Sequence, residues 1–221
     1  MYKQLNVNNT GIDIKKSVPR GYNHSDGLIF YRSHPQWLEI NEHLRILAKD
    51  ILNAYPNAKK FLDLGSGSGM VRYALHENNP ELLTISIDGN RETIRSPLID
   101  IDTHFILRTD QDYTIVDEND NVVTFDVICC FELFEHIEPK YFSIFINNIK
   151  KHSHKETVLI ASAATFGGPG SVHCNVKSVW DWDNELTHIY RMKKINSSIL
   201  NEHNFGIRIK DTSELHYKIY E

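Results

Sequence analysis

Three glycines at alternate positions follow a short apolar run, and this junction constrains the fold more than any other feature. The run is 61–64, the glycines are Gly65, Gly67 and Gly69, and a helix-forming segment, 70–76, comes next. Glycine has no Cβ, so the backbone can turn tightly there and lie against a ligand. The following helix points its free N–H groups and positive dipole end at the same place. This strand–loop–helix unit predicts an open α/β sheet with a nucleotide-type pocket at a strand's carboxyl end.

The composition is that of an ordinary globular protein. The 221 residues are 41% hydrophobic and 24% charged, which suits one domain with a sizeable core. A net charge of −5 gives no overall positive field toward nucleic acid. Of the three cysteines, Cys129 and Cys130 lie in an apolar run and are expected to be buried free thiols. No segment resembles a signal peptide or a membrane span, so we expect a cytoplasmic protein without a membrane partner.

Strand-like and helical segments alternate along most of the chain. Strands are expected at 60–64, 83–87, 103–107, 125–130 and 157–162, and helices at 35–54, 70–78, 91–96 and 140–151. This alternation predicts a parallel sheet with helices on both faces.

The remaining segments frame this domain. Residues 1–30 are polar and irregular and are expected to form an N-terminal arm or lid, with a single domain over 31–221. The segment 113–123 is expected to be a small hairpin insertion. Two terminal strands, 207–210 and 215–220, would form a C-terminal antiparallel hairpin.

Acidic residues close two of the predicted strands. Asp88 ends the second strand, where a carboxylate can accept hydrogen bonds from both hydroxyls of a ribose. Its neighbours Gly89 and Asn90 leave a capping role open as the alternative. Asp110 follows the third strand, and Asp112 stands close enough to be its rival.

The fourth predicted strand ends in Phe131-Glu132-Leu133-Phe134-Glu135-His136. If a helix begins there, Glu132 shares a face with Glu135 and His136. His173 follows the fifth strand and is expected at the same edge of the sheet. Two carboxylates and two imidazoles together can hold Mg²⁺ or Mn²⁺, or, with the imidazoles, Fe²⁺ or Zn²⁺. Without a metal, His136 or His173 is the candidate general base.

Together these motifs resemble those of the class I S-adenosylmethionine (SAM) methyltransferases. The G-x-G-x-G loop at 65–69 is similar to their motif I, and 131–139 is similar to a motif IV of the E-x-x-E-H form. The later stretch Ala161-Ser162-Ala163-Ala164, the glycine-rich 167–170 and His173-Cys174-Asn175 resemble a group of bacterial and phage-type domains. The resemblance covers about residues 30–182.

The resemblance implies a fold and a cofactor. The fold is a three-layer Rossmann-like α/β sandwich with a mostly parallel seven-stranded sheet that ends in the C-terminal antiparallel hairpin. The cofactor is SAM, with Asp110 at the adenine amino group and Arg32 at the methionine carboxylate, unless Arg32 is simply solvated. The residues expected at the cofactor are Asp63, Gly65, Ser66, Gly67, Gly69, Asp88, Gly89, Asp110, Phe131 and Arg32.

The resemblance also bears on catalysis. Small-RNA 3′-terminal 2′-O-methyltransferases and ubiquinone-pathway O-methyltransferases hold a metal on E-x-x-E-H, which implies Glu132, Glu135, His136 and His173 as ligands of Mg or Mn. Such a metal lowers the pKa of an acceptor hydroxyl. In the alternative without metal, Glu135 only bonds to the backbone and His136 stacks beneath the cofactor. The expected catalytic residues are His136, His173 and Glu132.

We therefore expect a SAM-dependent methyltransferase that methylates oxygen of a small hydroxylated molecule or sugar. The terminal ribose of an RNA is the second choice of acceptor, and a non-catalytic SAM-binding partner subunit is the third reading. The N/D-P-P-Y/F motif of base-amino methyltransferases is missing after the fourth strand, which argues against DNA. An NAD-dependent dehydrogenase would need its third glycine one place later.

A few conspicuous side chains stand outside these motifs. Trp180 and Trp182 are expected to pack beneath the active-site loop or to stack a planar substrate. His152 and His154 are expected in a solvated, lysine-flanked turn, and the other histidines outside the site on the surface.

Overall fold

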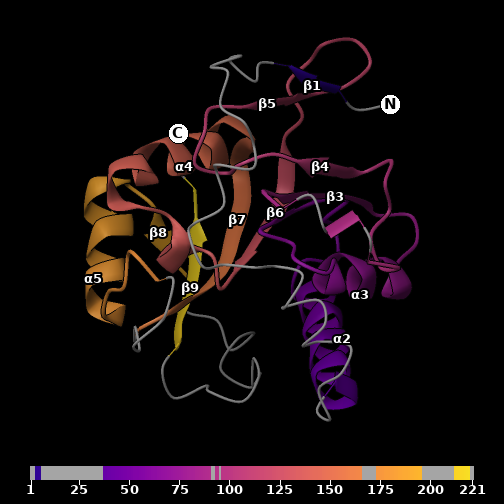
Figure 1. Ribbon diagram of the computed structural model, residues 1–221, viewed down its shortest axis with the longest axis horizontal. Helices are drawn as coiled ribbons and strands as arrows, with labels where there is room; N and C mark the ends of the chain where they lie inside the picture. The colour runs from indigo at the N-terminus through magenta and orange to yellow at the C-terminus, as the bar shows by residue number, and fades with distance from the viewer. Residues whose placement is uncertain are drawn as a thin grey trace.

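The computed structural model describes residues 3–5, 37–90, 93–94, 96–165, 173–195 and 212–219. Its centre is a seven-stranded sheet with helices on both faces (Figure 1). The strands of this sheet are β2 (Lys60–Leu64), β3 (Leu83–Asp88), β4 (His104–Ile106), β6 (Phe125–Phe131), β7 (Ser153–Ala164), β8 (Lys193–Lys194) and β9 (Thr212–Lys218). Within the described ranges, no helix combines the length and the apolar character needed to cross a membrane.

The strand order is β4-β3-β2-β6-β7-β9-β8. The pairs among β4, β3, β2, β6 and β7 are parallel, whereas β9 runs antiparallel to both β7 and β8. The predicted α/β Rossmann-like fold with a parallel sheet is therefore confirmed. The chain leaves β2 in one direction to β3 and returns on its other side at β6, so the order reverses there. In open α/β sheets a ligand crevice lies at the carboxyl ends of the strands beside such a reversal.

The predicted C-terminal hairpin is described only in part. Its first strand, 207–210, lies outside the described residues. The described antiparallel neighbour of β9 on the outer side is Lys193–Lys194, which the sequence did not indicate as a strand.

Among the described residues, four α-helices form the two outer layers. Helices α2 (Trp37–Ala54) and α3 (Met70–Asn78) lie together on one side of the sheet, and α4 (Pro139–Lys151) and α5 (Val179–Asn184) lie on the other (Figure 1). The observed bounds of β2 and α3 are those predicted. The predicted helix 91–96 is represented by a 3-10 turn at 93–94, and its other positions are described only in part.

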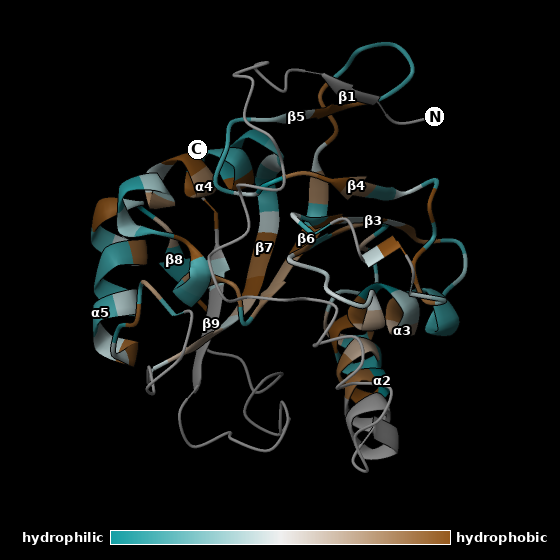
Figure 2. Cartoon of the chain, in the orientation of Figure 1, coloured by the Kyte–Doolittle hydropathy of each residue, from teal (hydrophilic) through white to brown (hydrophobic). Residues whose placement is uncertain are grey.

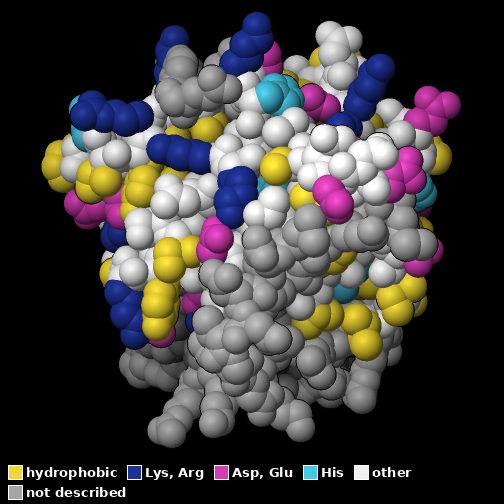
Figure 3. Space-filling model, turned by 90° about the horizontal axis from the view of Figure 1, so that it is seen from above, with side chains coloured by type: hydrophobic (Ala, Val, Ile, Leu, Met, Phe, Trp, Pro, Cys, Tyr) yellow, Lys and Arg dark blue, Asp and Glu magenta, His cyan; other side chains and the backbone are white. Residues whose placement is uncertain are grey.

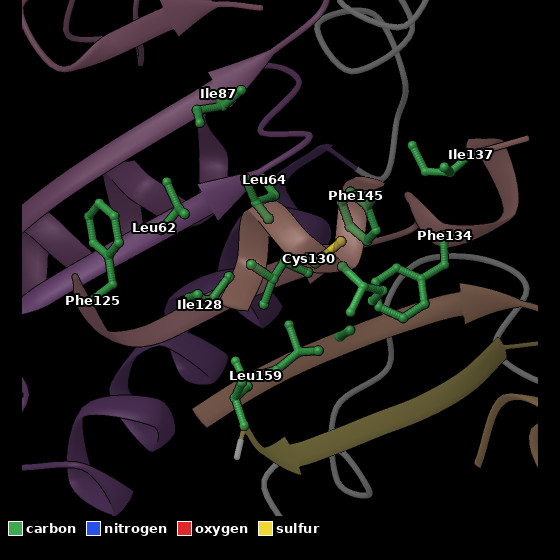
Figure 4. Packing of buried hydrophobic residues seen from close by; sticks show 14 of the residues in the cluster. Leu62, Leu64, Ile87, Phe125, Ile128, Cys130, Phe134, Ile137, Phe145 and Leu159 are labelled. Atoms are coloured by element: carbon green, nitrogen blue, oxygen red, sulfur yellow. The ribbon is translucent and has the colours of Figure 1, made fainter. Parts of the chain in front are cut away.

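Alternation along the central strands explains why both faces are covered. On β2, Phe61 packs with α2 and α3, whereas Leu62 and Leu64 pack in the cluster that contains α4. Figure 2 shows hydrophobic residues along β6 and β7 in the middle of the sheet. Strands buried on both faces have this near-continuous apolar character. Figure 4 shows the α4-side cluster, in which Phe134 and Phe145 close the space above Cys130 and Leu159.

The predicted insertion at 113–123 is a small hairpin. Strand β5 (Thr114–Val116) turns through Asp117, and the Val123 N–H returns to donate to the carbonyl of Ile115 at 3.0 Å. Strand β1 (Lys3–Leu5) pairs antiparallel with β5. A short piece of the predicted N-terminal arm is thus a strand.

Two histidines expected on the surface are buried, and that prediction was wrong. Burial lowers the pKa of His152 to about 4, and its Nδ1 lies 2.8 Å from the Val123 carbonyl while its Nε2 accepts from the Ile115 N–H at 3.2 Å. His104 lies between the hydroxyls of Ser86 and Thr93, at 2.8 and 2.9 Å. Both imidazoles therefore serve as internal hydrogen-bonding groups.

Candidate active site

The glycine loop leaves β2 in a backbone conformation that a side chain would not tolerate. Gly65 and Gly69 have φ angles of 69° and 80°, in the left-handed region. A Cβ added at Gly65 would lie 3.0 Å from Leu133 Cδ2, and one at Gly69 would lie 2.6 Å from Ile99 Cδ1. The neighbouring chain therefore packs directly on the loop backbone, and α3 begins immediately after it.

Asp88 at the end of β3 is tied to this loop. One of its carboxylate oxygens accepts from the Gly67 N–H at 2.8 Å, and the other accepts from the Asn90 N–H at 2.8 Å. The turn at Asn90 is the capping alternative, and it coexists with the contact to the loop. Each carboxylate oxygen keeps further acceptor capacity for a ligand. Position 89 has room for a side chain, because a Cβ added at Gly89 would lie at an ordinary contact distance of 3.7 Å from Arg108 Cγ.

Two side chains beside the loop each bury an oxygen atom that has no hydrogen-bond partner in the described parts of the chain. Asp63 is 5% exposed, and its Oδ2 has no hydrogen-bond partner among the described residues. Burial raises the pKa of Asp63 to about 7, and the nearby charge of Asp88 adds to the rise. The buried Ser66 hydroxyl is also without a partner within the same described part of the chain. Since most buried polar groups in proteins are satisfied, these two atoms are candidate acceptors for a ligand bound beside the loop.

The two rival aspartates after β4 differ in environment. Asp110 is buried and forms an ion pair with Arg108. The Asp112 side chain is 57% exposed and pairs with Lys151 at 2.5 Å. Phe131, also expected at the cofactor, is half-buried at the end of β6. Of the two aspartates, Asp110 is the one enclosed by the protein.

The segment after β6 does not form the helical face expected for Glu132. The 3-10 turn begins only at Phe134, and Glu132 precedes it with a φ of 52°. The Glu132 N–H donates to the Ser162 carbonyl at 3.0 Å, and the Ser162 hydroxyl donates to Glu132 Oε1 at 2.8 Å. The neighbouring strand, rather than a helix, thus fixes this carboxylate.

Glu135, His136 and His173 converge as the sequence predicted, and their ligand-type atoms all lie within 4.8 Å of one another. The two imidazole rings meet edge to face, with centroids 4.9 Å apart. His173 is brought there by its neighbours, because the backbone N–H groups of Cys174 and Asn175 donate to the Glu135 carbonyl at 2.8 and 3.0 Å. Three of the four expected metal ligands are thus in one cluster, with Glu132 beside it.

Glu135 is the unusual member of this cluster. It is fully buried, and neither carboxylate oxygen has a hydrogen-bond partner in the described ranges. Burial, and then the charge of Glu132, raise the pKa of Glu135 to about 8. A buried carboxyl without partners costs free energy, so the arrangement suits a cation or a hydrogen-bond donor at that place.

Some predicted residues are placed differently or not at all. Arg32 and the glycine-rich 167–170 lie outside the described residues. Trp182 is buried against Phe134 and Phe142, whereas Trp180 is 71% exposed. The sequence analysis gave Ser162 no role of its own. The signal for one was a hydroxyl among the apolar residues at the end of a predicted strand.

Solved methyltransferase structures share this fold at low sequence identity. NodS, an N-methyltransferase from Bradyrhizobium japonicum WM9 in complex with S-adenosyl-L-homocysteine (SAH), aligns with a TM-score of 0.61 at 14% identity, over 95% of this chain and 100% of NodS. The plantazolicin methyltransferase BpumL with a desmethyl analogue and SAH aligns with a TM-score of 0.59 at 11% identity, over 88% and 90%. An O-methyltransferase family protein from Burkholderia thailandensis aligns with a TM-score of 0.56 at 12% identity, over 80% and 55%. Since N- and O-methyltransferases both appear, the fold does not select the acceptor atom.

The sequence itself identifies the family. No curated protein matches the chain. The family model described as "Methyltransferase domain" matches residues 39–204, which include the glycine loop, Asp88 and the cluster around Glu135. The chain therefore belongs to the methyltransferase domain family and is a SAM-dependent methyltransferase.

Proposed function

We propose that this methyltransferase transfers a methyl group to a hydroxyl oxygen of a small molecule or sugar. The observation that carries the proposal is the convergence of Glu135, His136 and His173 within 4.8 Å, with the Glu132 carboxylate beside them. Methylation of a hydroxyl requires that its proton be removed as the new bond forms. Carboxylates and imidazoles are the side chains that suit this task near neutral pH.

The residues around the glycine loop fit SAM. Asp88 would accept from the ribose hydroxyls, Asp110 from the adenine amino group, and the orphaned Oδ2 of Asp63 from another donor of the cofactor. The left-handed φ angles of Gly65 and Gly69 turn the chain sharply from β2 into α3, which would bring the start of α3 to the cofactor. SAM supplies a methyl group already activated by its sulfonium. The protein's own contribution is to align the acceptor with that methyl group and to remove water and a proton.

The cluster also fits a divalent cation. Glu135, His136 and His173 would hold it, with Glu132 available as a fourth ligand, and a mixed set of oxygen and imidazole ligands suits Mn²⁺ and, less well, Mg²⁺. A bound cation lowers the pKa of a coordinated hydroxyl. In the alternative without a cation, His136 or His173 takes the proton of the acceptor.

The terminal ribose of an RNA is the second candidate acceptor, because the metal-type cluster suits two neighbouring hydroxyls. The surface gives it less support. On the face drawn in Figure 3, lysine and arginine side chains are interspersed with aspartate and glutamate. In the small basic group Arg191, Lys193 and Lys194, Lys194 is paired with Asp183. Nucleic-acid-binding surfaces instead carry a continuous basic stripe.

Labelled SAM distinguishes these acceptors. The protein is incubated with methyl-labelled SAM and either a metabolite extract or two RNA oligonucleotides that differ only in a 2′-hydroxyl or 2′-deoxy end. We expect label in a small hydroxylated product. Label only in the 2′-hydroxyl RNA would select the second candidate, and label on nitrogen would overturn the proposal. Repeating the reaction with chelator and then with added Mn²⁺ tests the cation, since full activity in chelator excludes it.

A further inference from the structure

Ser162 is a buried serine at the carboxyl end of β7 that contacts a residue of the site directly. It is fully buried, and its hydroxyl donates to Glu132 Oε1 at 2.8 Å. The Glu132 N–H lies 3.0 Å from the Ser162 carbonyl and 3.2 Å from its hydroxyl. Ser162 pairs with Phe131, which is the last paired residue of β6, so Glu132 is the first residue beyond the pairing of β6 with β7. One residue of β7 therefore binds both the backbone and the side chain of Glu132.

Glu132 has a conformation that needs such support. Its φ of 52° is in the left-handed region, which a residue with a side chain adopts at a cost. Strained residues persist where surrounding contacts determine them, and they are frequent at functional sites. Glu132 is also exposed, so its side chain would sample several rotamers without a partner. The bonds to Ser162 oppose both the backbone strain and the rotamer freedom.

The position of Glu132 matters because of its neighbour. Its charge is close enough to Glu135 to contribute to the raised pKa of that buried carboxyl. The single proton of the Ser162 hydroxyl is used on Oε1, so this bond holds the carboxylate by one of its two oxygens. A carboxylate held in one rotamer keeps its geometry toward a reacting group better than a mobile one.

We propose that Ser162 is a positioning residue of this enzyme: its hydroxyl holds the Glu132 carboxylate beside Glu135, in the orientation that serves the acceptor hydroxyl. This inference rests on the proposed function, because it assumes that Glu132 faces the acceptor. Ser162 itself touches neither the acceptor nor the cofactor in this scheme.

Three variants test this role. Ser162→Ala removes the hydroxyl, and Ser162→Thr retains it. The matched control is Thr157→Val, which removes another fully buried hydroxyl from the same strand, one that donates to the Phe125 carbonyl at 2.6 Å far from the site. Thermal unfolding of all three establishes which of them fold before any other measurement is compared.

The first readout needs no acceptor. Crystal structures with SAH are expected to show Glu132 in place in the wild type and in Thr157→Val. In Ser162→Ala its carboxylate should move or its φ should leave the left-handed region. An unmoved Glu132 in Ser162→Ala would overturn the proposal, even if Ser162→Thr does not fold.

The second readout uses an acceptor that the wild-type enzyme methylates. We expect kcat to fall about tenfold in Ser162→Ala with an unchanged KM for SAM, and to recover in Ser162→Thr. An equal fall in Thr157→Val would show that only general destabilisation is at work, which also overturns the proposal. Failure of the proposed function appears differently, as a wild-type enzyme that labels no hydroxyl.

Discussion

Two regions of this protein bury polar side chains, and they treat them in opposite ways. In the region where α4 meets the β5 insertion, Asn148 and His152 are fully buried and both use their side-chain donors and acceptors on backbone groups. At the carboxyl ends of β2 and β6, Asp63 and Glu135 are buried with oxygens that have no partner within the described residues. Buried groups without partners cost free energy that paired groups do not. Tyr113 Oη, which is buried in the first region, also has no partner among the described residues. The contrast therefore concerns four side chains: Asn148 and His152 build the fold, whereas Asp63 and Glu135 are the ones we propose to serve a ligand.

The pKa values show the same division. His152 is held neutral, because burial lowers its pKa to about 4, and a neutral ring can both donate and accept. Burial, and then the charge of Glu132, raise the pKa of Glu135 to about 8, so this buried carboxyl keeps its proton at neutral pH. Perturbed carboxyls of this kind concentrate at functional sites. The comparison can be tested by changing one side chain in each region.

The largest effect is expected from Asn148→Ala. Its amide nitrogen donates to the carbonyls of Thr109 and Gln111 at 3.2 and 2.6 Å, and its oxygen accepts from the Tyr113 N–H at 3.3 Å. Removing it leaves buried backbone groups unpaired, so the free energy of unfolding should fall by about 3 kcal/mol in urea denaturation. The exposed neighbour Asn147, changed to Ala, should alter it by less than about 0.5 kcal/mol. Equal changes in the two variants would contradict the role of the network.

Glu135→Gln should separate activity from stability. We expect methyl transfer to fall about 100-fold, or about 2.7 kcal/mol in the activation free energy, while the fold stays at least as stable. The pKa of Glu135 is raised in the folded state, so the wild type loses stability as pH rises from about 4.5 to about 8. The variant should lack this loss.

Glu138→Gln, at an exposed carboxylate paired with Lys140, is the control. If Glu135→Gln were destabilised but still active, Glu135 would be a residue that supports the fold rather than one that serves catalysis.

The buried His152 predicts a pH dependence of opposite sign. Its folded pKa of about 4 lies below the unfolded value of about 6.5, so the unfolded state binds the proton first. Stability should fall as pH drops from about 6.5 to about 4, by up to about 1.4 kcal/mol per pH unit from this residue. The difference between wild type and His152→Gln, measured by urea denaturation across that range, isolates it. His188→Gln, at an exposed site, is the matched control for replacing a histidine.

Two aspartates that are close in sequence differ in burial, and only the buried one, Asp110, is proposed to contact the cofactor. Asp110→Asn should weaken SAH binding about fivefold, or about 1 kcal/mol, measured by calorimetric titration. Asp112→Asn removes a mostly exposed ion pair with Lys151, so SAH affinity should be unchanged and stability should shift by less than about 0.5 kcal/mol. If SAH bound more weakly to Asp112→Asn than to Asp110→Asn, Asp112 rather than Asp110 would be the residue that contacts the cofactor.

The parts of the fold set by neighbouring residues were predictable. Strand β2 and helix α3 have the predicted bounds, because an apolar run, a glycine loop and a helix-forming segment follow each other directly. The convergence of His173 with Glu135 and His136 was also predicted, since the carboxyl ends of neighbouring parallel strands share one edge.

Features that depend on distant partners were missed. The burial of His152 follows from the Val123 carbonyl and the Ile115 N–H, which are 29 and 37 residues away in the chain. The expected helical face at Glu132 was wrong because Ser162, 30 residues on, fixes that residue in a left-handed conformation. Periodicity reports which face of an element is apolar, and it carries no information on such pairs.

The edge strands of the sheet bear on self-association of the protein. Among the described residues, the outermost strands are β4, which is three residues long, and β8, which has two residues, both of them exposed lysines. Long unpaired strand edges recruit strands from other chains, and short or lysine-bearing edges discourage this. In the described part of the chain, the large central sheet thus ends in edge strands that offer little backbone for aggregation.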